Sequence, residues 1–217
     1  MNDQTTPAHV AWDETWGTKN FDDAWLKPDQ YVLKTVETLA KRGATKVLDL
    51  GCGVGRHAIF FAEQGFETYA IDASEQGIAL LREQATIKDL RVDAQKSLMT
   101  SLPYPSNFFD HVLAFNVIYH GNPDEVVSTI SEIVRVLKPT GTYYGTMLST
   151  RNVGFGVGTE IDINTFVDLE GEKGHPHYYC DERQLRDLFQ ELPITELVEH
   201  EQHEADSWHW YLLCTKP

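Results

Sequence analysis

The sequence predicts an α/β fold, a doubly wound and mostly parallel sheet of seven strands with helices on both faces and an antiparallel pair of strands at the C-terminal end. Short apolar runs typical of strands alternate with segments of helical spacing from residue 46 to residue 189. A glycine-rich turn follows the first run, and two strand-like runs close the chain. We expect ligands at the carboxyl ends of the parallel strands.

The first elements are predicted from helix-terminal residues and apolar spacing. Residues 29–42 read as a helix with Pro28 at its start and Gly43 past its end. Residues 46–50 form a short apolar strand, and residues 55–64 show helical spacing immediately after it. These segments predict an N-terminal helix followed by the first strand–turn–helix unit.

A second unit and two further strands follow. Residues 68–71 predict a strand, after which Ser74 can cap a helix. Residues 90–96 predict a third strand with weak patterning, and residues 111–115 predict a strongly apolar fourth strand after a proline-containing loop. The order of elements is that of a parallel sheet built from crossover connections.

The clearest helix begins at Asn122, which can cap it, and stops before Pro139. A fifth strand is expected over residues 141–148, followed by a loop rich in Gly, His and Tyr that contains His175 and His177, and Asp181 can cap a last helix. The tail then alternates in two segments, which we expect to pair in antiparallel fashion. These segments are residues 194–200 and 208–213.

Composition limits the class of protein. The 217 residues are 41% hydrophobic, which suits one domain with one core over residues 1–217. Eighteen basic and 33 acidic residues leave a net charge of −15, so we expect neither a nucleic-acid nor a membrane partner. With neither a signal peptide nor an apolar run of spanning length, we expect a cytoplasmic location. Nothing in the sequence predicts the oligomeric state.

The strongest chemical signal is a glycine turn at the end of the first strand. Gly51, Gly53 and Gly55 let the backbone fold tightly and approach a ligand closely. Asp72 ends the next strand, where a carboxylate can accept hydrogen bonds from both hydroxyls of a ribose. The pattern predicts a nucleoside-containing cofactor, although a plain tight turn and a helix cap explain the same residues without one.

Two other cofactor classes also use glycine-rich motifs. Residues 53–58 match the loose G-x-G-x-x-G/A fingerprint, which keeps a nicotinamide-dependent oxidoreductase as an alternative. That register leaves Asp49 without a role, and counting from Gly51 puts Arg56 at the third fingerprint position. The triphosphate loop G-x-x-x-x-G-K-[ST] is absent from the sequence, which argues against phosphoryl transfer.

Residues 47–55 resemble the first motif of the class I, seven-stranded and Rossmann-like S-adenosylmethionine-dependent methyltransferases. Residues 101–110 resemble the family's loop before strand four, and residues 134–141 resemble its connection into strand five. The resemblance covers residues 45–150 and implies that they form the cofactor-binding core. Three further segments look like a small-molecule subgroup similar to tellurite-resistance-type methyltransferases. They are residues 116–121, 175–179 and 207–210.

The resemblance implies S-adenosyl-L-methionine as cofactor, S-adenosyl-L-homocysteine as product, and direct in-line transfer of the methyl group to a small molecule. Asp72 would hold the ribose, and Leu98 stands where the family usually has an acidic residue. This departure leaves open a catalytically silent cofactor-binding protein of the same fold. The implied cofactor-binding residues are Asp49, Gly51, Cys52, Gly53, Gly55, Asp72, Ala73, Leu98, Met99, Asn116 and Val117.

A sulfonium is already a strong methyl donor, so the protein mainly has to align the acceptor and exclude water. His120 is the candidate general base if the acceptor is protonated, and Tyr119 could orient the acceptor. Residues 1–43 are expected to form a lid and helix segment. We expect no metal, because the histidine spacing matches no known metal motif. The candidate substrate contacts, which could equally be packing residues, are Trp12, Trp16, Tyr31, His175 and His177.

Overall fold

The computed structural model describes residues 7–18, 23–169, 174–202 and 204–217. Residues 1–6 and 19–22 of the predicted lid therefore lie outside the described residues. In chain order the elements are α1 (Ala8–Gly17), η1 (Asp23–Leu26), α2 (Gln30–Lys41), β1 (Lys46–Leu50), α3 (Arg56–Glu63), β2 (Glu67–Asp72), α4 (Glu75–Ile87), β3 (Val92–Lys96), β4 (Phe109–Ala114), α5 (Pro123–Val136), β5 (Leu137–Ser149), β6 (Thr159–Asp162), β7 (Thr165–Val167), β8 (His177–Cys180), α6 (Glu182–Leu188), β9 (Ile194–Glu201) and β10 (Trp208–Thr215).

The predicted parallel sheet with a closing antiparallel pair is confirmed. Strands β3, β2, β1, β4 and β5 lie side by side in that order and run parallel. β10 pairs antiparallel with β5, and β9 pairs antiparallel with β10. These seven strands have the predicted arrangement, and the strand order reverses between β1 and β4, which creates a ligand crevice in such sheets.

The strand count was wrong, because the described residues form a sheet of ten strands. The additional β6, β7 and β8 come from a segment that was expected to be a loop. β8 pairs in parallel with the last residues of β5, where Leu148 lies opposite Tyr179, and β7 and β6 continue outward in antiparallel pairing. His177 therefore begins a strand and does not lie in a loop as expected.

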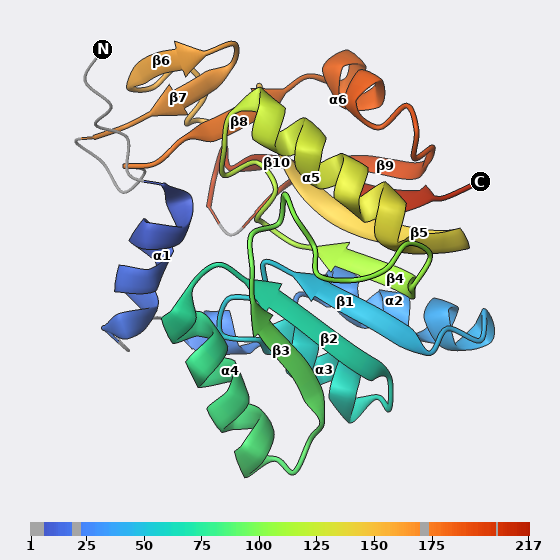
Figure 1. The fold of residues 1–217 in the computed structure, drawn as a ribbon. Helices are drawn as coiled ribbons and strands as arrows, with labels where there is room; N and C mark the ends of the chain where they lie inside the picture. The colour runs from blue at the N-terminus through green and yellow to red at the C-terminus, as the bar shows by residue number, and fades with distance from the viewer. Residues whose placement is uncertain (1–6, 19–22, 170–173, 203) are drawn as a thin grey trace.

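Helices cover both faces of the sheet, as predicted, because strand side chains alternate between the faces. On β1, Val47 packs with residues of α2 and α3, whereas Leu48 packs with residues of α5 and α6. A further apolar cluster joins α3 to α4 on the Val47 face. Figure 1 shows α5 in front of the sheet and α2 and α3 behind it. No described helix is long and apolar enough to cross a membrane.

The predicted helix caps form, which explains why the helix starts were predicted well. The Asn122 side chain accepts a hydrogen bond from the Glu125 N–H at 3.0 Å, and the Glu125 carboxylate accepts one from the Asn122 N–H. Ser74 caps α4 by accepting from the Gly77 N–H. Asp29 caps α2, so this helix starts one residue later than expected.

Candidate functional site

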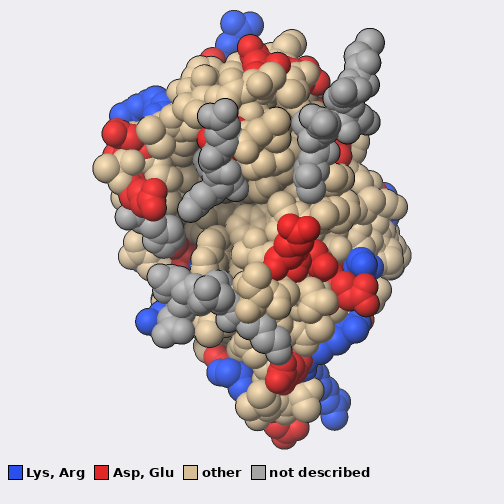
Figure 2. Space-filling model, turned by 90° about the vertical axis from the view of Figure 1, so that its left-hand side faces the viewer, with Lys and Arg blue, Asp and Glu red and all other residues tan. Residues whose placement is uncertain are grey.

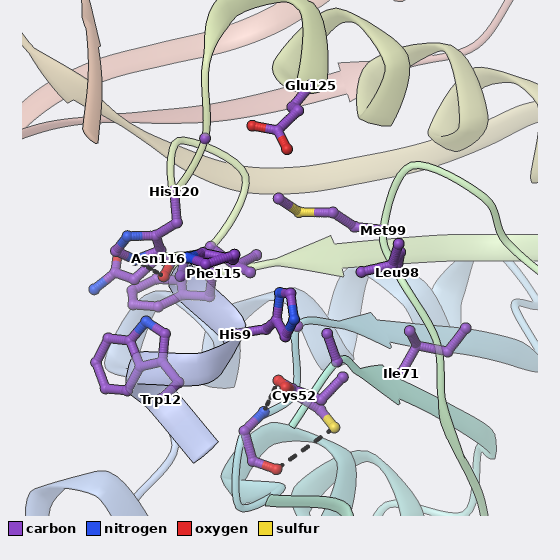
Figure 3. Close-up of a pocket in the computed structure, with 18 of the residues that line it drawn as sticks. His9, Trp12, Cys52, Ile71, Leu98, Met99, Phe115, Asn116, His120 and Glu125 are labelled. Carbon is purple, nitrogen blue, oxygen red and sulfur yellow. Dashed lines mark hydrogen bonds between the residues drawn. The ribbon is translucent and has the colours of Figure 1, made fainter. Parts of the chain in front are cut away.

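A cavity of about 580 Å³ lies at the carboxyl ends of β1, β2 and β4, under α1. Figure 3 shows Trp12 and His120 on one side of it, Leu98 and Met99 on the opposite side, Cys52 below and Glu125 above. Most of the predicted cofactor residues and three predicted catalytic or substrate residues line the cavity. The predicted residues that line it are Trp12, Trp16, Gly51, Cys52, Gly53, Asp72, Ala73, Leu98, Met99, Asn116, Val117 and His120.

The floor of the cavity is the glycine corner after β1. Gly51 and Gly53 have φ angles of +69° and +52°, which side chains disfavour. A Cβ atom at Gly51 would lie 2.1 Å from a methyl carbon of Val117, and one at Gly53 would lie 3.2 Å from the Trp16 ring. The absence of side chains here therefore leaves the backbone itself as the surface that a ligand meets.

Asp72 is fixed at the rim of this corner by two backbone groups. Its Oδ2 accepts a hydrogen bond from the Gly53 N–H at 2.8 Å, and its Oδ1 accepts one from the Ser74 N–H at 2.7 Å. Burial raises the pKa of the carboxyl group, and the backbone donors partly offset this. Each carboxylate oxygen keeps further acceptor capacity, so the oriented group suits a pair of hydroxyls such as those of a ribose.

Asp49 and Gly55, two predicted cofactor residues, lie beneath the cavity and do not line it. The buried Asp49 carboxylate accepts a hydrogen bond from the Ala58 N–H in the first turn of α3, and burial raises its pKa to about 7. Gly55 has a φ of +89°, and a Cβ atom there would lie 2.2 Å from the Leu81 side chain. Both residues shape the turn whose backbone faces the cavity.

Apolar side chains form most of the wall on the β2 and β3 side. The lining residues there are Ile71, Ala73, Leu98 and Met99, together with the polar Ser97 and Thr100. Leu98, at the position where the family usually has an acidic residue, is 53% exposed.

Tryptophans from the N-terminal segment close the opposite side. Trp12 and Trp16 stack with ring centroids 5.2 Å apart, and Trp25 meets both rings edge-on. Asp13 fastens α1 to the start of α4, because its Oδ1 accepts hydrogen bonds from the Ser74 hydroxyl at 2.8 Å and the Gln76 N–H at 3.0 Å. The segment expected to be a lid thus contributes part of the cavity wall.

The loop after β4 carries the polar side of the cavity. Asn116 has a φ of +57° and its side chain exchanges hydrogen bonds with Gln202, which holds this unusual conformation. His120 Nε2 lies 3.1 Å from the carbonyl oxygen of Asn116. Because a carbonyl can only accept, Nε2 carries the proton and a neutral His120 has its lone pair on Nδ1.

Tyr119 and Tyr31 do not line the cavity. Tyr119 is buried behind His120, with ring centroids 4.5 Å apart, and burial raises the pKa of its hydroxyl. Tyr31 lies on α2 on the other side of β4, where its ring packs on Tyr211 at 4.7 Å and near His200. The expectation that Tyr31 contacts substrate is therefore not supported, because α2 packs under the sheet.

His175 and His177 are both buried and gather around His120 instead of lining the cavity directly. His175 Nε2 lies 3.1 Å from His120 Nδ1. Pro176, between them, does line the cavity. The two predicted substrate contacts thus lie behind the residue that faces the ligand.

Sequence reasoning missed several residues that line the cavity. They are His9, Trp25, Arg56, Phe115 and Glu125. Arg56 stacks near the rings of Trp25 and Phe115, and burial lowers its pKa. These residues belong to no contiguous motif; Phe115, directly after β4, is the one that its position at a strand end could have indicated.

Comparisons with known proteins find a methyltransferase domain in this chain. A family model described as a methyltransferase domain matches residues 47–141. A putative methyltransferase of Geobacillus sp. (strain WCH70) is 32% identical over 121 residues, which are 55% of this chain and 47% of the relative. The chain spans about half the length of the curated relatives it matches.

Solved structures share the fold. The PH0226 protein from Pyrococcus horikoshii superposes with a TM-score of 0.71 at 21% identity, over 93% of this chain and 99% of that one. TehB from Haemophilus influenzae superposes with a TM-score of 0.66 at 19% identity, over 95% of this chain and 67% of that one. The predicted likeness to the tellurite-resistance type is therefore present in the fold. Residues 47–141 therefore match a methyltransferase domain, and the chain shares its Rossmann-like fold with these solved structures.

Proposed function

We propose that this chain transfers the methyl group of S-adenosylmethionine to a small-molecule acceptor by direct in-line displacement. The observation that carries the proposal is the glycine corner at Gly51 and Gly53, with the Asp72 carboxylate oriented beside it, inside one cavity at the carboxyl ends of the strands. Backbone groups at the corner and a carboxylate for the ribose are the contacts that a nucleoside cofactor needs. A nicotinamide cofactor is disfavoured by the family match.

The bound cofactor supplies an activated methyl group, so the protein has to position the donor and the acceptor and to exclude water. Gly51 and Asp72 fix the two ends of the donor, and the stacked Trp12 and Trp16 keep water from that side of the cavity. His120 borders the cavity, and its neutral ring has a lone pair on Nδ1, which can take up a proton from an acceptor when the contact with His175 Nε2 is released.

The size of the cavity and the elements that enclose it support a small molecule as the methyl acceptor. Its volume of about 580 Å³ falls within the range of small-molecule sites. Trp12 from α1, Ile161 from β6 and Pro176 before β8 all border it, so several elements enclose the space. A long polymer would have to displace these elements to reach the cavity.

Cofactor binding tests the proposal directly. We expect Asp72→Ala to weaken the binding of S-adenosylhomocysteine by about 5- to 150-fold, which corresponds to about 1–3 kcal/mol for polar groups left without their partner. Isothermal titration calorimetry measures this, and Asp93→Ala, an exposed carboxylate on β3, is the matched control. Wild-type protein that binds NADH and neither S-adenosylmethionine nor its product would overturn the proposal.

Turnover separates an enzyme from a silent protein of the same fold. We expect the wild type to convert S-adenosylmethionine to S-adenosylhomocysteine when it is incubated with a panel of small thiols, amines and phenols, and mass spectrometry detects both products. His120→Gln should lower kcat while leaving cofactor affinity within about threefold of the wild type, because His120 lies across the cavity from Leu98 and Met99. Tight cofactor binding without turnover of any acceptor would favour the silent alternative.

A further inference from the structure

Three histidines from distant parts of the chain converge beside the cavity. His120 follows β4, whereas His175 and His177 lie at the start of β8. Each offers one ring nitrogen, and these three nitrogens all lie within 4.8 Å of one another. His175 and His177 are buried, and His120 is half-buried at the cavity wall. The fold brings together two segments, residues 116–121 and 175–179, that lie more than 50 residues apart in the sequence.

Backbone carbonyls orient two of these rings. His120 Nε2 lies 3.1 Å from the Asn116 carbonyl oxygen, and His177 Nδ1 lies 2.9 Å from the His175 carbonyl oxygen. Since carbonyl oxygens only accept, both of these nitrogens carry hydrogen. The opposite nitrogens, His120 Nδ1 and His177 Nε2, therefore hold the lone pairs of the neutral rings. Histidines that bind metals are commonly fixed in this way, by a hydrogen bond from the nitrogen that does not face the ion.

The spacing within the cluster suits a small ion. His175 Nε2 and His120 Nδ1 are 3.1 Å apart. Two nitrogens that each lie about 2.0–2.1 Å from a tetrahedral zinc ion are themselves about 3.3 Å apart. The same pair can share a hydrogen while no ion is bound. The third nitrogen lies within 4.8 Å of both, so the three rings have to turn toward a shared ion when it binds.

We propose that His120, His175 and His177 form a binding site for a divalent transition-metal ion with an open coordination position toward the cavity. Three neutral imidazoles favour ions such as Zn²⁺, Co²⁺, Ni²⁺ or Cu²⁺ over Mg²⁺ or Ca²⁺, which prefer oxygen ligands. The Glu125 carboxylate borders the same cavity and adds negative charge to it.

An open position beside His120 has a chemical consequence that rests on the proposed function. Three imidazoles leave the double positive charge of an ion uncompensated, so the fourth position favours an anionic donor atom of a small molecule. Coordination lowers the pKa of such a donor, as it does for metal-bound water. With an ion bound, His120 Nδ1 is a ligand, and its role as a proton acceptor passes to solvent.

Metal titration of tag-free, chelator-treated protein tests the site. We expect one equivalent of Co²⁺ to bind and to show the visible absorption of a four-coordinate ion. Calorimetry with Zn²⁺ should give an affinity at least tenfold weaker in His175→Ala and in His177→Ala. His209→Ala is the matched control, because His209 is also buried and also has Nδ1 against a carbonyl oxygen, but lies outside the cluster.

X-ray absorption spectroscopy of the zinc-loaded wild type counts the imidazole ligands directly, so this test does not depend on whether the variants fold. Three imidazole ligands per ion are expected. One imidazole or none, the absence of saturable metal binding, or an equal loss of affinity in His209→Ala would each overturn the assignment. Binding of S-adenosylhomocysteine to metal-free protein is measured separately, so failure of the metal site and failure of the proposed methyl transfer remain distinguishable.

Discussion

Asp49 and Asp72 lie near the carboxyl ends of neighbouring strands, but their different surroundings give them different roles. The Asp72 carboxylate borders the cavity and is held by the N–H groups of Gly53 and Ser74. The Asp49 carboxylate is 2% exposed and bonds to the Ala58 N–H inside the protein. Asp49 therefore stabilises the turn whose backbone faces the ligand, and Asp72 can contact the ligand itself.

The raised pKa of Asp49 makes stability depend on pH in a testable way. Burial raises this pKa from 3.8 to about 7. Between these values the folded protein holds a proton that the unfolded chain has lost, so the group's contribution to the free energy of unfolding falls as pH rises. Asp49→Asn removes this titration and keeps an oxygen for the Ala58 N–H.

We therefore expect the free energy of unfolding of Asp49→Asn to increase by about 2–3 kcal/mol, relative to that of the wild type, as pH rises from 5 to 7. Urea unfolding at several pH values measures the difference, and the exposed Asp93→Asn serves as the comparison. A difference between Asp49→Asn and wild type that stays constant with pH would show that the buried carboxyl is ionised throughout.

Gly51 allows backbone strain to be separated from steric clash. An alanine at Gly51 would carry a Cβ 2.1 Å from Val117 at a φ of +69°, whereas Gly65 has a φ of +87° with nothing within 4 Å of a Cβ. We expect Gly51→Ala to be less stable than Gly65→Ala by about 1–3 kcal/mol, the typical cost of overpacking. Thermal unfolding compares them. Equal losses would mean that the corner can shift without cost.

At the scale of elements, a helix or strand could be predicted from the sequence when the interactions that hold it lie between residues close in the chain. Asn122 and Ser74 cap helices through neighbours three residues away, so a single sequence displays the signal. β8 is held by pairing of Tyr179 with Leu148 at the far end of β5, and nothing in the local pattern shows this partner. For the same reason the turn at Gly51 was predictable, whereas the positions of Tyr31 and Trp25 were not.

The attachment of α1 should control how fast the ligand leaves. Asp13 joins α1 to α4 through Ser74 and Gln76, and Trp12 and Trp16 on the same helix border the cavity. We expect Asp13→Ala to speed dissociation of S-adenosylhomocysteine by about fivefold, since about 1 kcal/mol of hydrogen bonding is lost. Stopped-flow tryptophan fluorescence measures this rate.

Glu14→Ala is the control for this experiment, because Glu14 is an exposed carboxylate on the same helix. Its dissociation rate should match that of the wild type. An Asp13→Ala rate equal to the wild-type rate would show that α1 stays in place without this contact.

At the scale of the whole molecule, the net charge of −15 surrounds a cavity that contains both signs of charge. Asp72, Glu125 and Arg56 border the cavity. Figure 2 shows the side that carries α1, where acidic side chains gather near a central hollow and basic ones lie mainly toward the margins. The charge total was available from the sequence, whereas the grouping of these three side chains depends on the assembled sheet.

The electric field of the negatively charged protein should act differently on S-adenosylmethionine and S-adenosylhomocysteine as each ligand approaches. S-adenosylmethionine carries one positive charge more than S-adenosylhomocysteine, so a negative protein attracts it more strongly at a distance. We expect its association rate constant to fall by about two- to tenfold between low salt and about 0.5 M NaCl, where charges are screened within a few ångströms. The product, with the same shape and no sulfonium, is the matched control and should change much less. Both rates can be followed through the fluorescence of Trp12 and Trp16 at the cavity wall. Equal salt dependence for the two ligands would mean that the charge of the protein does not steer the sulfonium during the encounter.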